Sequence, residues 1–174
     1  AEMRVSAGTW DGRPARVAAL RDVTERHRAQ AEAQRAALHD PLTGLPGRPL
    51  LIDRVRSAIM ASGRERPQAA PVLMLMDIDR FSHVDETIGH RQADALLAAV
   101  GRRLADRLRA SDTVARLGGD EFGVLISALP GPAAAEQAAR RLIACLDDPF
   151  PVGSRTVQLR GSVGVAIGGG ATDA

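Results

Sequence analysis

Three amino acids are absent from this 174-residue chain: it contains no lysine, no asparagine and no tyrosine, and all 23 of its Lys-or-Arg positions are arginine. A Walker-type phosphate loop, a protein-kinase site and a Schiff-base enzyme each require a lysine amine at the reacting centre, so the sequence excludes these three classes. The codons of the missing residues are AT-rich. Together with the abundance of alanine and arginine, this points to a GC-rich genome as the main cause.

Aromatic residues, cysteine and long apolar runs are also scarce. Three phenylalanines, one tryptophan and a net charge of +2 do not provide a stacking or basic surface, so we expect no nucleic-acid partner. Because the chain has one cysteine, a disulfide or zinc framework within one chain is excluded. This residue, Cys145, lies in an apolar helical pattern that suits a buried position. No apolar run approaches the length of a membrane span and no signal-peptide pattern is present, so we expect a cytoplasmic segment without membrane contact.

The first 38 residues are expected to be separate from the rest. Residues 3–7 and 16–20 alternate like two strands around a turn, and two strands alone cannot bury a face. Residues 1–23 are therefore predicted to be the end of a domain that begins outside the chain. Residues 24–38 are predicted to form a helix, which is either a signalling stalk paired with its copy in another subunit or a solvated linker.

A second domain is expected over residues 39–174, because two prolines and two glycines in 40–47 end the helix. Its periodicity predicts three helices and four strands, with a further short strand near 150–152. The helices are expected over 49–60, 92–108 and 133–146, and the strands over 72–76, 113–117, 122–126 and 156–167. This order predicts a mixed α/β or α+β fold with helices packed on a sheet.

Two acidic clusters are the candidate chemical features. Asp77, Ile78 and Asp79 directly follow a buried strand, where two carboxylates and a backbone carbonyl can hold a hard divalent cation or simply cap the next turn. The second cluster, 118–121, reads Gly-Gly-Asp-Glu. It is either an ordinary tight turn or a place where phosphates approach the backbone beside two acids. If the two strands are neighbours, Asp77 and Asp120 meet at one rim and can share metal ions bound to a nucleoside triphosphate.

These residues resemble the GGDEF domain of diguanylate cyclases. The resemblance rests on Asp-Ile-Asp-Arg-Phe at 77–81, Gly-His at 89–90, Asp94 and Arg-Leu-Gly-Gly-Asp-Glu-Phe at 116–122, and it includes Asp-Pro-Leu-Thr-Gly-Leu-Pro at 40–46. It implies an α+β fold with a ferredoxin-like βαββαβ core, similar to nucleotide-cyclase and polymerase palms, with helices packed on a mostly antiparallel sheet. The implied activity condenses two GTP molecules into cyclic di-GMP, with release of pyrophosphate, across a transient homodimer.

The resemblance also implies roles for individual residues. Asp77, the Ile78 carbonyl and Asp120 would hold Mg²⁺ or Mn²⁺, and Asp120 and Glu121 would be the catalytic acids. GTP would be bound by a third set, comprising Phe81, Asp85, His90, Asp94, Gly118 and Gly119. Asp94 is also explained as an acid favoured at a helix N-terminus.

Regulation is implied by further matches. Arg109 and Asp112 fit the RxxD inhibitory site at which the product cyclic di-GMP would bind, although an Arg-x-x-Asp sequence also suits a polar helix end. Residues 1–23 and the sequence Asp-Val-Thr-Glu-Arg at 22–26 resemble the end of a PAS sensor domain. The segment 149–154 is similar to GGDEF domains that precede EAL phosphodiesterase domains.

Two departures from the family pattern define a competing hypothesis. Ser82 stands where the family usually has a lysine, and Asp85 where it usually has an asparagine. The family's last helix, with its phosphate-binding lysine and arginine, is also lacking from residues 39–174, which leaves Arg80 and Arg48 as candidate replacements. The chain is therefore expected to be either a diguanylate cyclase or a degenerate regulatory module that binds GTP or cyclic di-GMP. The second hypothesis includes a position upstream of an EAL domain.

Overall fold

The chain divides into two units, Ala1–Ala37 and Leu38–Ala174. The computed structural model describes residues 2–25, 37–65 and 69–168. In the first unit, β1 (Glu2–Trp10) and β2 (Arg13–Arg21) form an antiparallel hairpin. Asp11 and Gly12 turn it with positive φ angles, as a two-residue hairpin loop requires. Both predicted strands are confirmed, whereas the helix predicted over 24–38 lies mostly outside the described residues.

The described part of the second unit contains a four-stranded sheet, four α-helices, a 3₁₀ turn and a small hairpin. The helices are α2 (Arg48–Glu65), α3 (Phe81–Ile88), α4 (His90–Asp106) and α5 (Pro132–Ile143), followed by η1 (Ala144–Leu146). The sheet strands are β3 (Ala70–Ile78), β4 (Thr113–Gly118), β5 (Glu121–Leu129) and β8 (Gly161–Ile167), and the hairpin strands are β6 (Phe150–Val152) and β7 (Arg155–Val157). Among the described residues no helix is long and apolar enough to cross a membrane.

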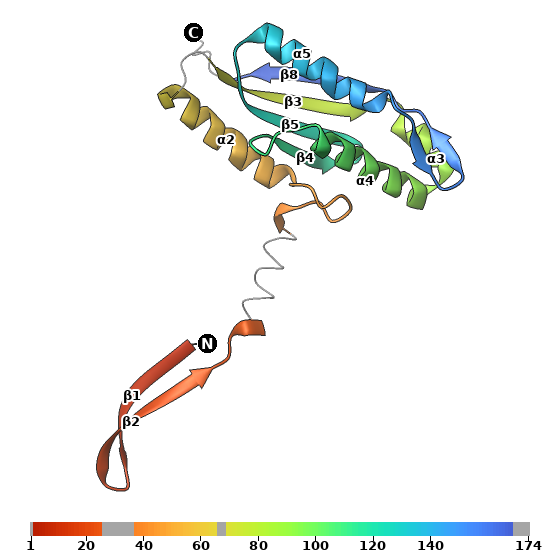
Figure 1. Cartoon of the computed structure of the whole chain (residues 1–174). Helices are drawn as coiled ribbons and strands as arrows, with labels where there is room; N and C mark the ends of the chain where they lie inside the picture. The colour runs from red at the N-terminus through yellow and green to blue at the C-terminus, as the bar shows by residue number, and fades with distance from the viewer. Residues whose placement is uncertain (1, 26–36, 66–68, 169–174) are drawn as a thin grey trace. The chain divides into compact units, whose positions relative to one another are not determined.

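The sheet has the strand order β4-β5-β3-β8, and each neighbouring pair is antiparallel (Figure 1). The chain runs from β3 through α3 and α4 to β4, and from β5 through α5 to β8. Each of these connections passes over an intervening strand, which is the split βαβ topology of the ferredoxin-like fold. The predicted α+β class and antiparallel sheet are confirmed.

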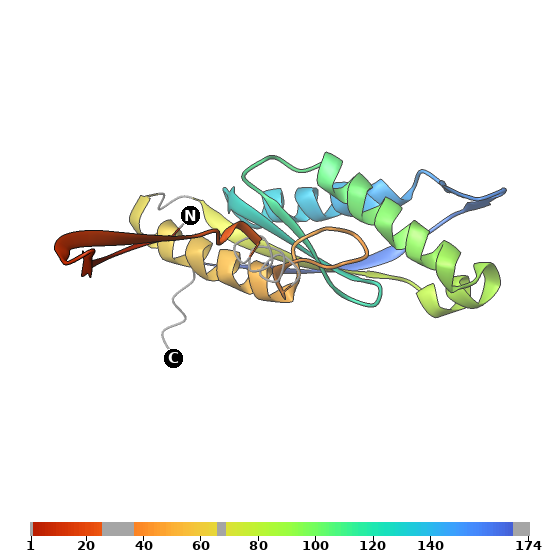
Figure 2. The same ribbon diagram turned by 90° about the horizontal axis from the view of Figure 1, so that it is seen from below.

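Helices cover both faces of the sheet, with α2 on one face and α4 and α5 on the other (Figure 2). Alternate residues of β3 face α4 and α5, and they are fully buried: Val72, Met74, Met76 and Ile78. The intervening residues of β3, ending in Asp77, therefore face the α2 side. A smaller core under α2 contains Leu51, Ala115 and Leu125.

Two predicted elements differ from the structure. The sequence analysis did not predict α3, although Phe81, Val84 and Ile88 are spaced as one helical stripe. The single strand predicted over 156–167 is wrong, because residues 158–160 separate β7 from β8. In this break Leu159 is buried in the core, and the side chain of Gln158 donates to the carbonyls of Leu146 and Asp147.

Candidate functional site

Acidic residues from two neighbouring strands meet at one edge of the sheet. Asp77, near the end of β3, lies opposite Glu121 of β5 on one side and opposite Ser162 of β8 on the other. Asp79 follows the strand, and its carboxylate accepts a 2.8 Å hydrogen bond from the Ser162 hydroxyl. Since β3 and β5 are adjacent, the condition for Asp77 and Asp120 to meet is satisfied. We call the group Asp77, Asp79, Asp120 and Glu121 the acidic rim.

The β4–β5 hairpin places two glycines beside this rim. Gly118 pairs with Glu121, so that Gly119 and Asp120 form the tip. Gly118 has φ 133° and Gly119 has φ 54°, and no atom lies within 4 Å of the position that a Cβ would take at either residue. The positive φ angles favour glycine, and the open space leaves the backbone of the tip accessible to a ligand.

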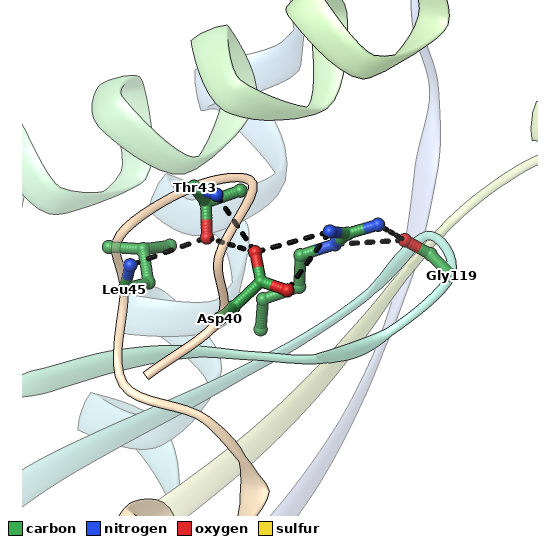
Figure 3. A network of polar contacts seen from close by, with 5 residues as sticks. Asp40, Thr43, Leu45 and Gly119 are labelled. Atoms are coloured by element: carbon green, nitrogen blue, oxygen red, sulfur yellow. Dashed lines mark hydrogen bonds and ion pairs between the residues drawn. The ribbon is translucent and has the colours of Figure 1, made fainter. Parts of the chain in front are cut away.

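A single arginine connects the tip to the Asp40–Gly47 segment. The guanidinium of Arg116 donates to both carboxylate oxygens of Asp40 at 3.1 Å and, through Nε and Nη2, to the Gly119 carbonyl at 3.1 and 2.7 Å. Thr43 donates to the same carboxylate through its backbone N–H and its hydroxyl, and Figure 3 shows Asp40, Thr43 and Gly119 in this network. The network fixes the carbonyl next to Asp120 and therefore the position of the tip.

The acidic rim carries more negative charge than its surroundings neutralise. Partial burial and the neighbouring carboxylates raise the pKa of Asp77, and the carboxylates responsible are those of Asp120, Glu121 and Asp79. Among the described ion pairs, one reaches the rim, with Arg48 Nη2 3.4 Å from Glu121 Oε2. Unneutralised carboxylates suit a hard divalent cation. However, no group of three or more Asp, Glu, His or Cys side chains is arranged as a complete cation site in the described part of the chain.

The predicted base-binding residues lie on α3 and α4. The side chains of Asp85 on α3 and His90 at the start of α4 are in contact, with 2.7 Å between Oδ2 and Nδ1, and Asp94 is exposed one turn further along α4. The other oxygen of Asp85, Oδ1, is buried without a hydrogen-bond partner. The ring of Phe81 belongs to the main core, which leaves only its backbone available for ligand contact.

The Arg109–Asp112 segment forms a turn between α4 and β4. The Asp112 carboxylate accepts from the backbone N–H of Arg109 at 3.2 Å, which stabilises this turn. Both residues line a groove of about 890 Å³, which also contains Arg141 of α5 and Arg54 of α2. We call it the edge groove. It presents several guanidinium groups beside one carboxylate.

The chain is similar in sequence to known proteins. The sequence profile of the family described as "Diguanylate cyclase, GGDEF domain" matches residues 37–173. The chain belongs to this family. It is 41% identical over 140 residues to the bifunctional diguanylate cyclase/cyclic di-GMP phosphodiesterase MucR of Pseudomonas aeruginosa, which covers 80% of the chain and 20% of MucR. It is 35% identical over 155 residues to the diguanylate cyclase TpbB of the same species, covering 86% of the chain and 35% of TpbB.

Solved GGDEF structures have the same fold. The GGDEF domain of TpbB superimposes with a TM-score of 0.68 at 33% identity, over 72% of this chain and 77% of that one. A sensory box/GGDEF family protein from Caulobacter crescentus gives a TM-score of 0.69 at 35% identity, over 75% and 83% of the two chains. The chain thus corresponds to a small part of its full-length relatives but to most of the isolated GGDEF domains.

Two long-range arginine contacts of this GGDEF domain carry no local sequence signal. Arg116 binds Asp40 and Arg48 binds Glu121, and Arg141 was likewise not expected to line the edge groove with Arg109. The two pairs of partners lie 76 and 73 positions apart. No local pattern marks such pairs in a chain with so many arginines. The position of Arg116 two residues before the glycine pair was the one available signal.

Proposed function

We propose that residues 39–174 form a diguanylate cyclase domain that condenses two GTP molecules into cyclic di-GMP. The main support is the register of β3 and β5, which places Asp77 beside Glu121 and the open tip of Gly118 and Gly119. Acids from two strands next to an accessible backbone form a suitable cradle for a metal-bound triphosphate. Such a site acts mainly by positioning and charge stabilisation, so it requires no nucleophilic side chain.

Asp77, the Ile78 carbonyl and Asp120 are the proposed ligands of Mg²⁺ or Mn²⁺. Their oxygen donors fit a hard cation, and the pKa of Asp77 is raised by desolvation and by the neighbouring carboxylates, whose negative charge a cation would neutralise. When bound, such an ion polarises the phosphates and stabilises the charge that develops on them. Glu121 is proposed to hold the metal or to accept the proton of the attacking hydroxyl.

The nucleotide is proposed to extend from the hairpin tip to α3 and α4. Gly118 and Gly119 would face its phosphates, the Phe81 backbone would lie alongside them, and the residues near the base would be Asp85, His90 and Asp94. The Asp94 carboxylate is exposed and suited to accept from the N1–H and amino group of guanine. In each step a 3′-hydroxyl attacks an α-phosphorus, a P–O bond forms, the bond to the β-phosphate breaks and pyrophosphate leaves.

Each domain would bind one GTP, so the reaction requires two domains facing each other across a two-fold axis. The test is incubation of the chain with GTP and Mg²⁺ while its oligomeric state is followed, with cyclic di-GMP and pyrophosphate quantified by liquid chromatography and mass spectrometry. Both products are expected, with a rate that rises as the square of protein concentration at low concentration. Asp77→Asn and Asp120→Asn are expected to abolish product. Product formation that persists in both variants would refute the assignment.

The alternative is a degenerate GGDEF module that binds GTP or cyclic di-GMP without turnover. The observation that favours it is Asp85, whose Oδ1 is buried without a partner and whose negative charge would lie near the nucleotide. Isothermal titration calorimetry distinguishes the hypotheses. Binding of GTP without product supports the module, and binding of neither nucleotide refutes both.

The edge groove is the proposed site of product feedback. Arg109 and Arg141 offer bidentate donors for phosphate or guanine, and Asp112 offers an acceptor. One solved GGDEF domain with 26% identity and a TM-score of 0.64 is described as interacting with cyclic di-GMP. Arg109→Ala is expected to weaken cyclic di-GMP binding and to relieve inhibition. Unchanged inhibition in this variant would refute the proposal that the edge groove is the site of product feedback.

The domain boundaries are also part of the proposal. Residues 1–23 are assigned to the end of a PAS-like sensor, 24–38 to a signalling helix, and 39–174 to a GGDEF domain. The half-exposed Leu75 lies between Gly123 and Gly164 on the α2 face of the sheet. The small β6–β7 hairpin is consistent with a position upstream of an EAL domain.

A further inference from the structure

Arg48 occupies an unusual position at the acidic rim. It is the first residue of α2, and its backbone is held on both sides. Gly47 donates to the Leu38 carbonyl at 2.7 Å, and Pro49 restricts the φ angle that follows. The side chain itself is 58% exposed, and among the described residues it pairs with Glu121 alone, which is 54% exposed. The backbone of Arg48 is therefore fixed, whereas its guanidinium is free to change partners.

Among the described arginines, Arg48 is the one whose side chain pairs with a carboxylate of the rim, although Arg160 also lies close by, with its exposed side chain and with its carbonyl accepting from the Asp79 N–H at 2.9 Å. Arg116 is 10% exposed and committed to Asp40 and the Gly119 carbonyl. Arg80 lies in the left-handed region at the N-cap of α3, and no described ion pair joins it to the acidic rim. No lysine can supply the charge, because the chain contains none and position 82 is a serine. A bound triphosphate adds several negative charges to four carboxylates and requires a cation from the protein.

On these grounds we propose that Arg48 is the phosphate-binding cation of this site, and that it pairs with Glu121 while no triphosphate is bound. This inference rests on the proposed function. A cation held by the acidic rim would compete with Arg48 for the Glu121 carboxylate, so the guanidinium would become available to another anion. The released group lies at the N-terminus of α2, where backbone N–H groups also favour an anion, and it can bind two phosphate oxygens at once. The competing interpretation is an ordinary surface ion pair, which contributes almost nothing to the stability of the fold and has no role in binding.

The test compares Arg48→Ala and Arg48→Lys with the wild-type chain and with Arg56→Ala, which removes an exposed arginine from the same helix. The probes are Mg²⁺ with GMPCPP, whose α–β bridge is a methylene group, and GMP, which lacks the β- and γ-phosphates. Arg48→Ala is expected to weaken GMPCPP binding by about 10- to 100-fold, the effect of one charge-assisted pair, and to change GMP binding less than about 2-fold. Arg48→Lys is expected to lie between, and Arg56→Ala to match the wild type.

A second measurement does not depend on the metal. Without divalent ions, Glu121→Gln is expected to increase the affinity for inorganic triphosphate, because the guanidinium has lost its carboxylate, and this gain should vanish in the double variant with Arg48→Ala. Equal GMPCPP affinity in wild type and Arg48→Ala would overturn the inference while leaving the proposed function intact. Failure of the wild type to bind GMPCPP at all would overturn both.

Discussion

Replacement of Arg116 by methionine provides the most quantitative test of the structure. The Arg116 and Asp40 side chains are 10% and 15% exposed, and the guanidinium makes four hydrogen bonds, two to the carboxylate and two to the Gly119 carbonyl. Methionine preserves much of the apolar volume but leaves the Asp40 carboxylate with Thr43 as its remaining partner among the described residues. Removal of one member of a buried pair costs about 3–5 kcal/mol, so we expect the free energy of unfolding to fall by that amount at pH 7.

The assay is urea unfolding followed by circular dichroism at 222 nm. The same substitution at Arg140 is the control, because Arg140 forms an exposed i,i+4 pair with Glu136 and is expected to lose no more than about 0.5 kcal/mol. Asp40→Asn and the double variant complete a double-mutant cycle. The losses of unfolding free energy in the two single variants are expected to add up to about 1.5–3 kcal/mol more than the loss in the double variant.

The pH dependence gives an independent check. Burial alone would raise the pKa of Asp40, but hydrogen bonds from Thr43 and the contact with Arg116 outweigh it and lower the pKa. The stabilisation is therefore complete above the unfolded-state pKa of about 4 and is lost as the pH falls through the lower folded-state value. The difference between wild type and Arg116→Met should shrink as the pH falls below about 4. A difference no larger than that of the Arg140 control would refute the reasoning.

Three further predictions concern other parts of the domain. Asp85→Asn replaces a buried, unpaired carboxylate oxygen and removes a charge, so calorimetry should show GMP binding about 3- to 10-fold tighter; weaker binding would mean that the carboxylate itself recognises the base. Asp77→Asn relieves repulsion in the acidic rim, so scanning fluorimetry without divalent ions should show Tm raised by up to roughly 2–4 °C, and a lower Tm would contradict this account of the charges. Arg103 donates to the carbonyls of Cys145, Asp148 and Pro149 and lies 3.5 Å from the ring centroid of Phe150, so Arg103→Ala should lower the free energy of unfolding by about 2–3 kcal/mol; a loss near zero in urea unfolding would show that water replaces these contacts.

Local patterns were sufficient to predict most of the fold. The apolar run before Asp77 predicted β3 because a strand covered on both faces needs no polar alternation. The glycine pair predicted the β4–β5 hairpin because only glycine readily adopts the positive φ angles found there. The short α3 was missed because no side chain caps it and a left-handed Arg80 precedes it. Its apolar stripe was present in the sequence but short.

The functional site was predictable only in part. The acids of the acidic rim lie in short, dense motifs, and adjacency of β3 and β5 was the single assumption needed to bring them together. The roles of Arg116 and Arg48 depend on contacts across more than seventy residues. In a chain whose basic side chains are all arginine, composition does not distinguish a structural guanidinium from a ligand-binding one. Burial and partner geometry make that distinction.

The most direct test of the central claim is a crystal structure of the domain with Mn²⁺ and GMPCPP, using the anomalous scattering of manganese to locate the ion. The account predicts an anomalous peak coordinated by Asp77 and Asp120, with the triphosphate against Gly118 and Gly119. Nucleotide bound elsewhere, or manganese that avoids both carboxylates, would contradict the proposal that this rim is the catalytic centre.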